Sequence, residues 1–298
     1  MEINYDSGRL LRIFLEGKGL GMRKRYGQNF LINRQVRKRL VDSLEAGEGE
    51  AVWEIGPGLG AMTELLLARG MKVRAFEIDP GFSALLRERF GGNGNFSLVE
   101  GDVLKNWREH PPSPLLLGNL PYTIGAALLG DFIEEGRFFR RMVVTVQKET
   151  AERMAAPPGS AAYSSFSVLC GSVYRVSPLL SIHRSSFYPA PHVDSRGVRL
   201  DLLDGAEGRN FPPLFHPLVR SLFSSRRKMI KNTLSDFVSS RIMGSEGPRG
   251  ENLSRRVLDA AGLKGDERPD SLGTAAFLAL AEALAHTELL GDSDVDSR

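Results

Sequence analysis

The chain has 298 residues, of which 42% are hydrophobic and 25% are charged, a composition typical of soluble globular proteins. The formal net charge is only +3, and the single cysteine, Cys170, excludes an internal disulfide and suits a reducing cytoplasm. No stretch approaches the roughly 18 apolar residues of a membrane span, and the five histidines lack metal-ligand spacing, so we expect neither a membrane anchor nor a metal site.

Apolar, β-branched runs alternate with helical patterns from about residue 36 to residue 176. The predicted strands are residues 51–55, 73–78, 96–100, 115–120 and 142–147, with helices near 62–68 and 82–90. This alternation is typical of βαβ units in a parallel sheet. Two later strands, near 179–182 and 198–203, are separated by a proline-rich connection and predict an antiparallel edge. The fold class is therefore α/β, with a mostly parallel seven-stranded sheet.

The pattern changes after about residue 205, where a polar, glycine-bearing linker begins. Helical patterns follow at residues 214–223, 227–237, 253–260 and 275–285, and Asp270 or Ser271 is placed to cap the last helix. We expect a first domain over residues 1–205, in which residues 1–22 have no assignable motif. A small all-helical domain would cover residues 206–298, ending in a disordered acidic tail at 287–298.

Three neighbouring strands are followed by groups that suit a nucleoside cofactor. Gly56 and Gly58 follow the first strand, where a ligand can approach the backbone and the next helix offers free N–H donors. Taken alone they also fit a dinucleotide-binding pattern. Glu77 ends the second strand and can accept hydrogen bonds from both ribose hydroxyls, while Asp102, after the third, can accept from an adenine amino group or simply cap a turn or helix. This order of groups is that of an S-adenosylmethionine site.

The fourth strand ends in Asn119, Leu120, Pro121 and Tyr122. The Asn119 side-chain oxygen and the Leu120 carbonyl can both accept from one flat amino group, and Tyr122 can stack on its ring. Pro121 stiffens the turn. The alternative is an ordinary strand-ending turn, in which Asn and Pro are common.

Together these residues resemble the class I S-adenosylmethionine-dependent methyltransferases and, more narrowly, the KsgA/RsmA family of ribosomal RNA adenine N6-dimethyltransferases. The resemblance extends from about Arg23 to about Leu284. The segments that carry it are residues 25–31 (RYGQNFL), 54–60 (EIGPGLG), 118–122 (GNLPY), 187–195 (FYPAPHVDS) and 223–228 (FSSRRK). The glycine segment is generic to methyltransferases, whereas the first and fourth segments are much more specific.

The resemblance implies a class I methyltransferase fold, S-adenosylmethionine as cofactor, and a set of site residues. The implied cofactor-binding residues are Gln28, Asn29, Leu31, Gly56, Gly58, Glu77, Ile78, Asp102, Val103 and Asn119. Asn29 and Leu31 would close over the cofactor. The implied catalytic residues are Asn119, Leu120, Pro121, Tyr122 and Phe187. Phe187 would stack on the flipped target base opposite Tyr122, although packing within its loop is an alternative.

Clustered basic residues indicate a polyanionic partner, although any single basic run is usually a solvated surface. The clusters that would contact RNA phosphates are Arg23, Lys24 and Arg25, and Arg226, Arg227, Lys228 and Lys231. In the family the substrate is a pair of adjacent adenines in the hairpin loop near the 3′ end of small-subunit rRNA. We therefore expect small-subunit (16S) rRNA in the 30S pre-ribosomal particle as the partner, and a monomeric protein.

The sequence is also compatible with other functions. A related enzyme class methylates one large-subunit adenine and confers antibiotic resistance, and a non-catalytic assembly factor or transcription cofactor could keep the fold. A nicotinamide-dependent dehydrogenase is a weaker alternative. The sequence also departs from the family pattern at Ser195-Arg196-Gly197-Val198, where a charge replaces an apolar residue and predicts an edge strand or a bulge.

Overall fold

The computed structural model describes residues 3–23, 26–241 and 248–291. Contacts between residues divide the chain into two compact units, the first formed by residues 1–151 and 174–204 and the second by residues 152–173 and 205–298. The first unit ends at Asp204, directly before the predicted linker. Residues 152–173, which we expected in the first domain, belong to the second unit instead, because Tyr163 and Val168 are buried in its hydrophobic core.

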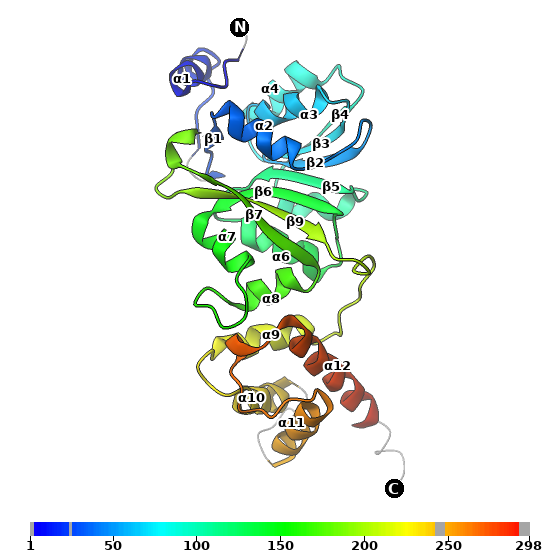
Figure 1. Ribbon diagram of the computed structural model, residues 1–298. Coiled ribbons are helices and arrows are strands. Elements are labelled where there is room, and N and C mark those ends of the chain that lie inside the picture. Colours follow the sequence, from blue (N-terminus) through cyan, green and yellow to red (C-terminus); the bar gives the residue numbers. More distant parts are fainter. Residues whose placement is uncertain (1–2, 24–25, 242–247, 292–298) are drawn as a thin grey trace. The chain divides into compact units, whose positions relative to one another are not determined.

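A seven-stranded sheet forms the centre of the first unit (Figure 1), and the strand order is β4-β3-β2-β5-β6-β9-β7. The strands are β2 (Ala51–Ile55), β3 (Lys72–Glu77), β4 (Phe96–Glu100), β5 (Leu115–Asn119), β6 (Arg141–Gln147), β7 (Tyr174–Ile182) and β9 (Ser195–Leu202). The first five are parallel, and β9 runs antiparallel to both β6 and β7. The predicted mostly parallel seven-stranded sheet is therefore confirmed.

The irregularity predicted near residues 195–198 lies on the neighbouring strand. β9 is not at the edge, since it pairs with β6 on one side and β7 on the other. The bulge occurs in β7, between Pro178 and Leu180, opposite Gly197. A Cβ atom at Gly197 would come within 2.7 Å of the Leu180 side chain, so the glycine makes room for the bulged strand.

The two faces of the sheet bury different side chains, because successive strand residues point to opposite faces. Val52, Val73 and Leu117 belong to an aliphatic core that includes residues of α2 (Arg34–Asp42) and α3 (Ala61–Leu67). The other face is aromatic, and there Trp53 contacts Phe76 and Phe132. Phe132 comes from α6 (Gly125–Glu134), which lies on the opposite side of the sheet from α2 and α3 (Figure 1).

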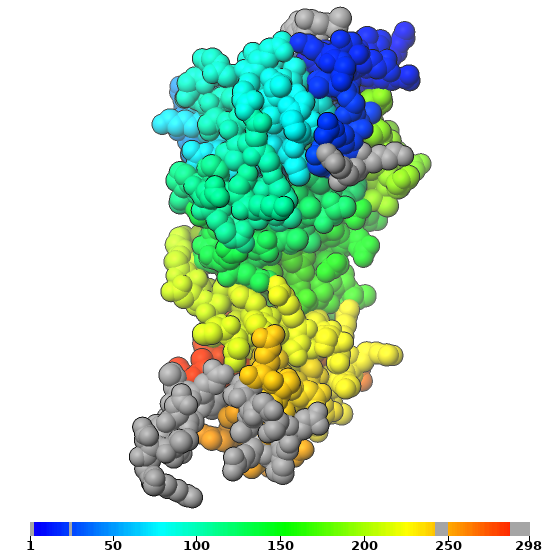
Figure 2. Space-filling view, turned by 180° about the vertical axis from the view of Figure 1, so that it is seen from behind, coloured from blue at the N-terminus to red at the C-terminus, as the bar shows by residue number. Residues whose placement is uncertain are grey.

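The N-terminal segment, for which the sequence offered no assignment, folds onto the first unit. Ser7 caps α1 (Gly8–Gly17), and Leu11, Phe14 and Leu15 of this helix are buried against Leu59, Phe82 and Leu85. Figure 2 shows the blue N-terminal residues lying against cyan residues of the same unit. After α1, the short strand β1 (Phe30–Leu31) pairs with β8 (Phe187–Tyr188) in a separate two-stranded sheet. The remaining helices of this unit are α4 (Pro80–Phe90) and α5 (Val103–Asn106), and α7 (Lys148–Met154) spans the boundary between the two sets of residues.

The second unit is helical within the described residues. Its helices are α8 (Ser165–Gly171), α9 (Phe215–Ser224), α10 (Ile230–Arg241), α11 (Pro248–Ala260) and α12 (Thr274–Gly291). The predicted cap of the last helix is wrong, because Asp270 and Ser271 lie in a 3-10 turn (Pro269–Ser271) and α12 begins at Thr274. α12 also continues into the predicted tail, and residues 292–298 lie outside the described part.

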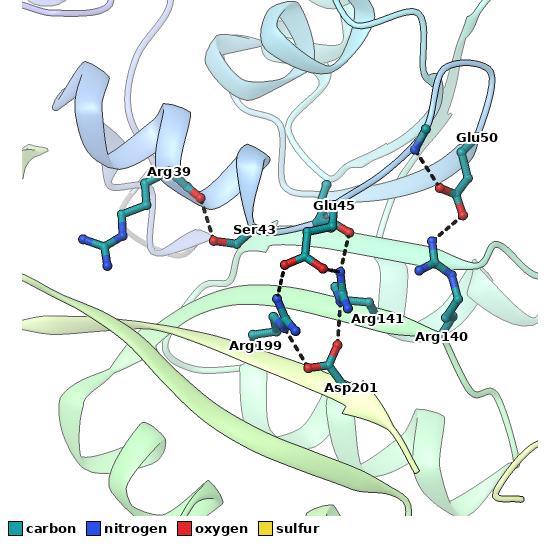
Figure 3. A network of polar contacts seen from close by, with 10 residues as sticks. Arg39, Ser43, Glu45, Glu50, Arg140, Arg141, Arg199 and Asp201 are labelled. Atoms are coloured by element: carbon teal, nitrogen blue, oxygen red, sulfur yellow. Dashed lines mark hydrogen bonds and ion pairs between the residues drawn. The ribbon is translucent and has the colours of Figure 1, made fainter. Parts of the chain in front are cut away.

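A ring of four charged side chains joins three segments at the amino-terminal edge of the parallel strands (Figure 3). Arg141, the first residue of β6, and Arg199 of β9 each contact both Glu45 and Asp201, at N–O distances of 2.5–2.7 Å. Partial burial opposes ionisation of Asp201, but hydrogen bonds from Arg199 and Arg141 hold its pKa below the ordinary value. The same two arginines lower the pKa of Glu45. The ring thus fixes the loop after α2 to strands β6 and β9.

Replacing Asp201 with Asn should destabilise the protein at pH 7 by about 1 kcal/mol, because Arg141 and Arg199 lose a shared carboxylate. A carboxyl group whose pKa is lowered by folding stabilises the fold above its unfolded value, about 3.9, and loses that contribution as the pH falls through the folded value. Urea unfolding should therefore show the two proteins converging as the pH is lowered below about 4. Asp42→Asn, which removes an exposed pair with Arg69, is the control. An unchanged difference at low pH would contradict the role of the ionised ring.

Candidate active site

The carboxyl ends of β2, β3 and β5 border one cavity, as expected for a ligand site in an open α/β sheet. The predicted site residues that line it are Gln28, Asn29, Leu31, Gly56, Gly58, Glu77, Ile78, Asn119, Leu120, Pro121 and Tyr122. Asp102, Val103 and Phe187 are not part of this lining. Residues separated by up to 94 positions in the sequence are thus brought together. The predicted cofactor-binding residues and the predicted amine-binding turn line the same cavity.

The loop after β2 is shaped by glycines in left-handed backbone conformations. Gly58 has φ = 57°, and a Cβ atom there would lie 3.0 Å from the Phe30 ring. Its backbone N–H donates to Oε2 of Glu77 at 2.9 Å, while the N–H of Asp79 donates to Oε1 at 2.8 Å. Each carboxylate oxygen can still accept a further hydrogen bond. Glu77 is therefore held in place with acceptor capacity left for two ribose hydroxyls.

Two buried carboxyl groups lie behind the glycine loop. Glu77 is 5% exposed, and desolvation raises its pKa to about 7 although it accepts backbone hydrogen bonds. Glu54, in β2, is fully buried and accepts a hydrogen bond from the Thr63 hydroxyl at 2.7 Å. Burial also raises the pKa of Glu54 to about 7, with a contribution from the nearby Glu77 charge. Near neutral pH both carboxyl groups are therefore only partly ionised.

The segment before β1 lies over the carboxyl end of β3. The Gln28 amide donates to Oδ2 of Asp79 at 3.1 Å and accepts from the Arg23 backbone N–H at 2.7 Å. The Arg23 guanidinium lies 3.7 Å from the same Asp79 carboxylate. Arg23, which we expected to contact RNA, thus helps to fix the predicted cofactor-closing segment, and Lys24 and Arg25 lie outside the described residues.

Asn119, the last residue of β5, contacts two other segments through its side-chain amide. Nδ2 donates to the backbone carbonyl of Asn29 at 2.8 Å, and Oδ1 accepts from the Thr145 hydroxyl at 2.9 Å. The contact with Asn29 joins the turn formed by residues 119–122, here called the acceptor turn, to the segment before β1, which lines the same cavity. Thr145 was not among the predicted site residues, because a single Thr in a β-branched strand carries no functional signal.

Tyr122 is anchored at its hydroxyl end. Its oxygen lies 2.5 Å from Oγ of Ser195, a residue that is 1% exposed at the start of β9. Desolvation raises the pKa of the Tyr122 hydroxyl, so the side chain remains neutral near pH 7. The ring can therefore present a fixed aromatic wall to the cavity that it lines.

Asp102 has the role that the sequence analysis offered as its alternative. Its Oδ1 accepts from the Leu104 backbone N–H at 3.1 Å and caps α5. β4 pairs with β3 in parallel, so Asp102, two residues beyond the end of β4, lies at the same edge of the sheet as Glu77. Val103, the first residue of α5, is buried. A contact between Asp102 and adenine stays a prediction.

Phe187 is placed differently from the expected stacking partner of a target base. Its side chain is 3% exposed and packs in the aliphatic core with Leu31, its partner in the short β1–β8 sheet. Stacking on a base requires an accessible ring face, and here that face is covered. In this structure Phe187 supports the cavity wall from behind Leu31, which corresponds to the packing alternative.

The N-terminal segment contributes residues that the sequence gave no reason to select. Tyr5 and Leu11 line the cavity, and the Tyr5 hydroxyl donates to the Leu59 carbonyl at 2.9 Å. Arg37, which is 4% exposed, donates to the backbone carbonyls of Leu31 at 2.7 Å and Tyr5 at 3.2 Å and also contacts Asp6. Arg37 therefore joins the N-terminal segment to the predicted cofactor-closing segment.

The predicted RNA-binding residues of the second unit divide into two groups. Arg226 donates to the carbonyls of Ala161 at 2.7 Å and Ser160 at 2.9 Å and pairs with Asp270 at 3.1 Å, so its guanidinium is occupied within the unit. Arg227, Lys228 and Lys231 are exposed. Basic residues from α10, α11 and the adjoining loops line a groove, and they are Lys228, Lys231, Arg255 and Lys264. Acidic side chains that adjoin them in this groove are Asp236, Glu251 and Asp259.

Across residues 3–23, 26–241 and 248–291, His, Cys, Asp and Glu side chains form no group of three or more that could hold a metal ion. None of the helices described there is both long and apolar enough to cross a membrane.

Comparison with known proteins agrees with this geometry. Residues 19–274 match the family described as Ribosomal RNA adenine dimethylase. The chain is 44% identical over 290 residues to Ribosomal RNA small subunit methyltransferase A of Treponema denticola, covering 95% of this chain and 96% of that protein. Its structure is similar to a dimethyladenosine transferase from Plasmodium falciparum, with a TM-score of 0.73, 26% identity, and 83% and 94% of the two chains covered. It is also similar to the 23S rRNA methyltransferase ErmE, with a TM-score of 0.61, 26% identity, and 85% and 98% covered. The chain therefore belongs to the ribosomal RNA adenine dimethylase family.

Proposed function

We propose that this protein transfers methyl groups from S-adenosylmethionine to N6 of two adjacent adenines in the 3′-terminal hairpin loop of small-subunit rRNA, during assembly of the 30S particle in the cytoplasm. The observation that carries the proposal is the meeting of Glu77 and the Asn119–Tyr122 turn in one cavity. Glu77 provides the acceptors that a ribose requires, and the turn provides the acceptors that an exocyclic amine requires. We further propose that the protein acts as a monomer.

The residues of the cavity suit S-adenosylmethionine. Gly56 and Gly58 leave the backbone open to the ligand, and Glu77 keeps acceptor capacity after binding two backbone N–H groups. Gln28, Asn29 and Leu31 line the same cavity and would close over the cofactor. When bound, the cofactor supplies a methyl group already activated by its sulfonium charge. Asp102 and Val103, at the neighbouring strand end, would border the adenine.

The acceptor turn would orient the target amine. The lone pair of an adenine N6 atom is delocalised into the ring, which makes it a poor nucleophile. Oδ1 of Asn119 and the carbonyl of Leu120 would accept its two hydrogens, favouring a more pyramidal nitrogen with a directed lone pair. Tyr122 would stack on the base. Positioning of the reacting groups then supplies much of the rate.

The RNA surface would include the exposed residues of the second unit. Arg227, Lys228 and Lys231 would contact phosphates, which fix register without reading sequence. A hairpin loop suits the site because its bases leave the stack more readily than bases in a duplex. The neighbour ErmE is described as a 23S rRNA methyltransferase, so a large-subunit substrate is the rival to be tested.

The decisive experiment measures methyl transfer from labelled S-adenosylmethionine to undermethylated 30S particles, with 50S particles as the control substrate. We expect label in 30S only, and mapping should place dimethyladenine at two adjacent positions of the 3′-terminal hairpin. Asn119→Ala should reduce transfer by at least about a hundredfold, as removal of a group that stabilises the transition state does elsewhere. Label confined to 50S would instead identify a large-subunit enzyme, and an unimpaired Asn119→Ala would exclude the role given to its amide.

Cofactor binding should depend on pH through Glu77. Its pKa of about 7 means that its ionised form, the better acceptor for ribose hydroxyls, predominates only above neutrality. Affinity measured by calorimetry should therefore rise about tenfold between pH 6 and pH 8. Glu77→Gln should bind more weakly and lose most of this slope. Glu54→Gln is a matched control, since Glu54 has a similar pKa but does not line the cavity, and an equal loss of slope there would contradict the assignment to Glu77.

Binding of the RNA hairpin should depend on salt through the second unit. Replacing Lys228 and Lys231 together by Ala should weaken binding and reduce the slope of log affinity against log salt by about 1.5, because two phosphate contacts are lost. Arg256→Ala removes an exposed charge of α11 outside the groove and should change the slope little. Equal effects of the two changes would mean that the groove has no special role.

A further inference from the structure

Thr145 is a buried polar residue directly beside the acceptor turn. It lies in the interior strand β6, is 0% exposed, and is the strand partner of Asn119 in the parallel β5–β6 pair. Its hydroxyl donates to Oδ1 of Asn119 at 2.9 Å, and the Gly118 carbonyl lies farther away, at 3.4 Å. A hydroxyl has one hydrogen to donate, and the shorter contact with Asn119 takes it.

The surroundings of Asn119 allow only one orientation of its amide. The Asn29 carbonyl, 2.8 Å from Nδ2, can only accept a hydrogen bond, so it must face the NH2 group. Turning the amide over would place two carbonyl oxygens at that distance and leave no good donor between them. The Thr145 hydroxyl on the other side completes the arrangement by donating to Oδ1.

We propose that Thr145 is a positioning residue that keeps Oδ1 of Asn119 directed at the target amine. The proposal rests on the methyl-transfer function proposed above. Oδ1 accepts two hydrogen bonds, of which Thr145 occupies one, and the second remains for the substrate. A reversed amide would present N–H groups to the amino group of adenine, donor against donor, and the turn could not bind its target.

Thr145 is the more permanent of the two restraints on the amide. Asn29 lies in the segment that is expected to close over the cofactor, and it must be displaced if that segment opens. Thr145 lies in a strand that is paired on both sides, with β5 and with β9. When the cofactor exchanges, the hydroxyl of Thr145 would preserve the orientation of Asn119 for the next transfer.

The test compares two substitutions at this position in single-turnover transfer to undermethylated 30S particles. Thr145→Val keeps the shape but removes the hydroxyl, and it should lower the transfer rate about tenfold, as expected for one neutral hydrogen bond, while cofactor affinity and unfolding stability change little. Thr145→Ser restores the donor and should recover most of the rate. Combined with Asn119→Ala, the valine substitution should cause no additional loss, because the group that it positions is absent.

Parent-like transfer by Thr145→Val, or a further loss of rate on top of Asn119→Ala, would overturn the proposal while leaving the proposed function intact. A measurement that needs no methylation further separates failure of this proposal from failure of the proposed function. The Asn119 side-chain amide protons, assigned in NMR spectra by their disappearance in Asn119→Ala, should give one sharp pair in the parent and in Thr145→Ser. In Thr145→Val they should broaden or double, and an unchanged pair would overturn the proposal even if the parent methylated no particle.

Discussion

The parallel register of β2 with β3 and β5 is the constraint on which the active site depends. Ile55 pairs with Phe76 on one side and with Gly118 on the other. The residues that follow these three are Gly56, Glu77 and Asn119, so the glycine loop, the ribose acceptor and the amine acceptor reach the same level of the sheet. A shift of one residue in either pair would turn the functional side chain to the opposite face. The cavity exists because three separate strands end together.

This part of the site could be predicted from the sequence because it follows directly from the strands. Each functional residue stands at the end of an apolar run, and the carboxyl ends of parallel strands share one edge. The antiparallel pair β7–β9 was also predictable, since a proline-rich connection without a helix cannot make a parallel crossover. The irregularity was expected near residues 195–198, but it lies in the partner strand β7, between Pro178 and Leu180. Gly197 makes room for the Leu180 side chain, and the pattern of one strand does not show which strand it pairs with.

Other features depend on contacts between residues far apart in the chain, which local patterns do not encode. Arg226 resembles a phosphate-binding residue in sequence, but Asp270, 44 positions later, and two backbone carbonyls occupy its guanidinium. Phe187 stands in a specific motif, yet its ring is buried behind Leu31. Tyr5 reaches the cavity only because α1 folds back onto the first unit. In each case the residue type indicates what the side chain can do, and its distant contacts determine which role it has in the fold.

The two halves of the cavity differ in their electrostatic character, and the difference suits the chemistry. The cofactor half contains Glu77, a carboxyl group whose pKa is raised to about 7 by desolvation, and the positive charge of a bound cofactor would favour its ionised form. The acceptor half is built from neutral groups, and the cavity-lining residues within the described chain include no His, Lys or Cys. A neutral half is sufficient, because the adenine amine becomes strongly acidic only after it has gained the methyl group and can then release its proton without a dedicated base. The acceptor half must instead orient the target amine, and this orientation depends on how firmly the Asn119 amide is held.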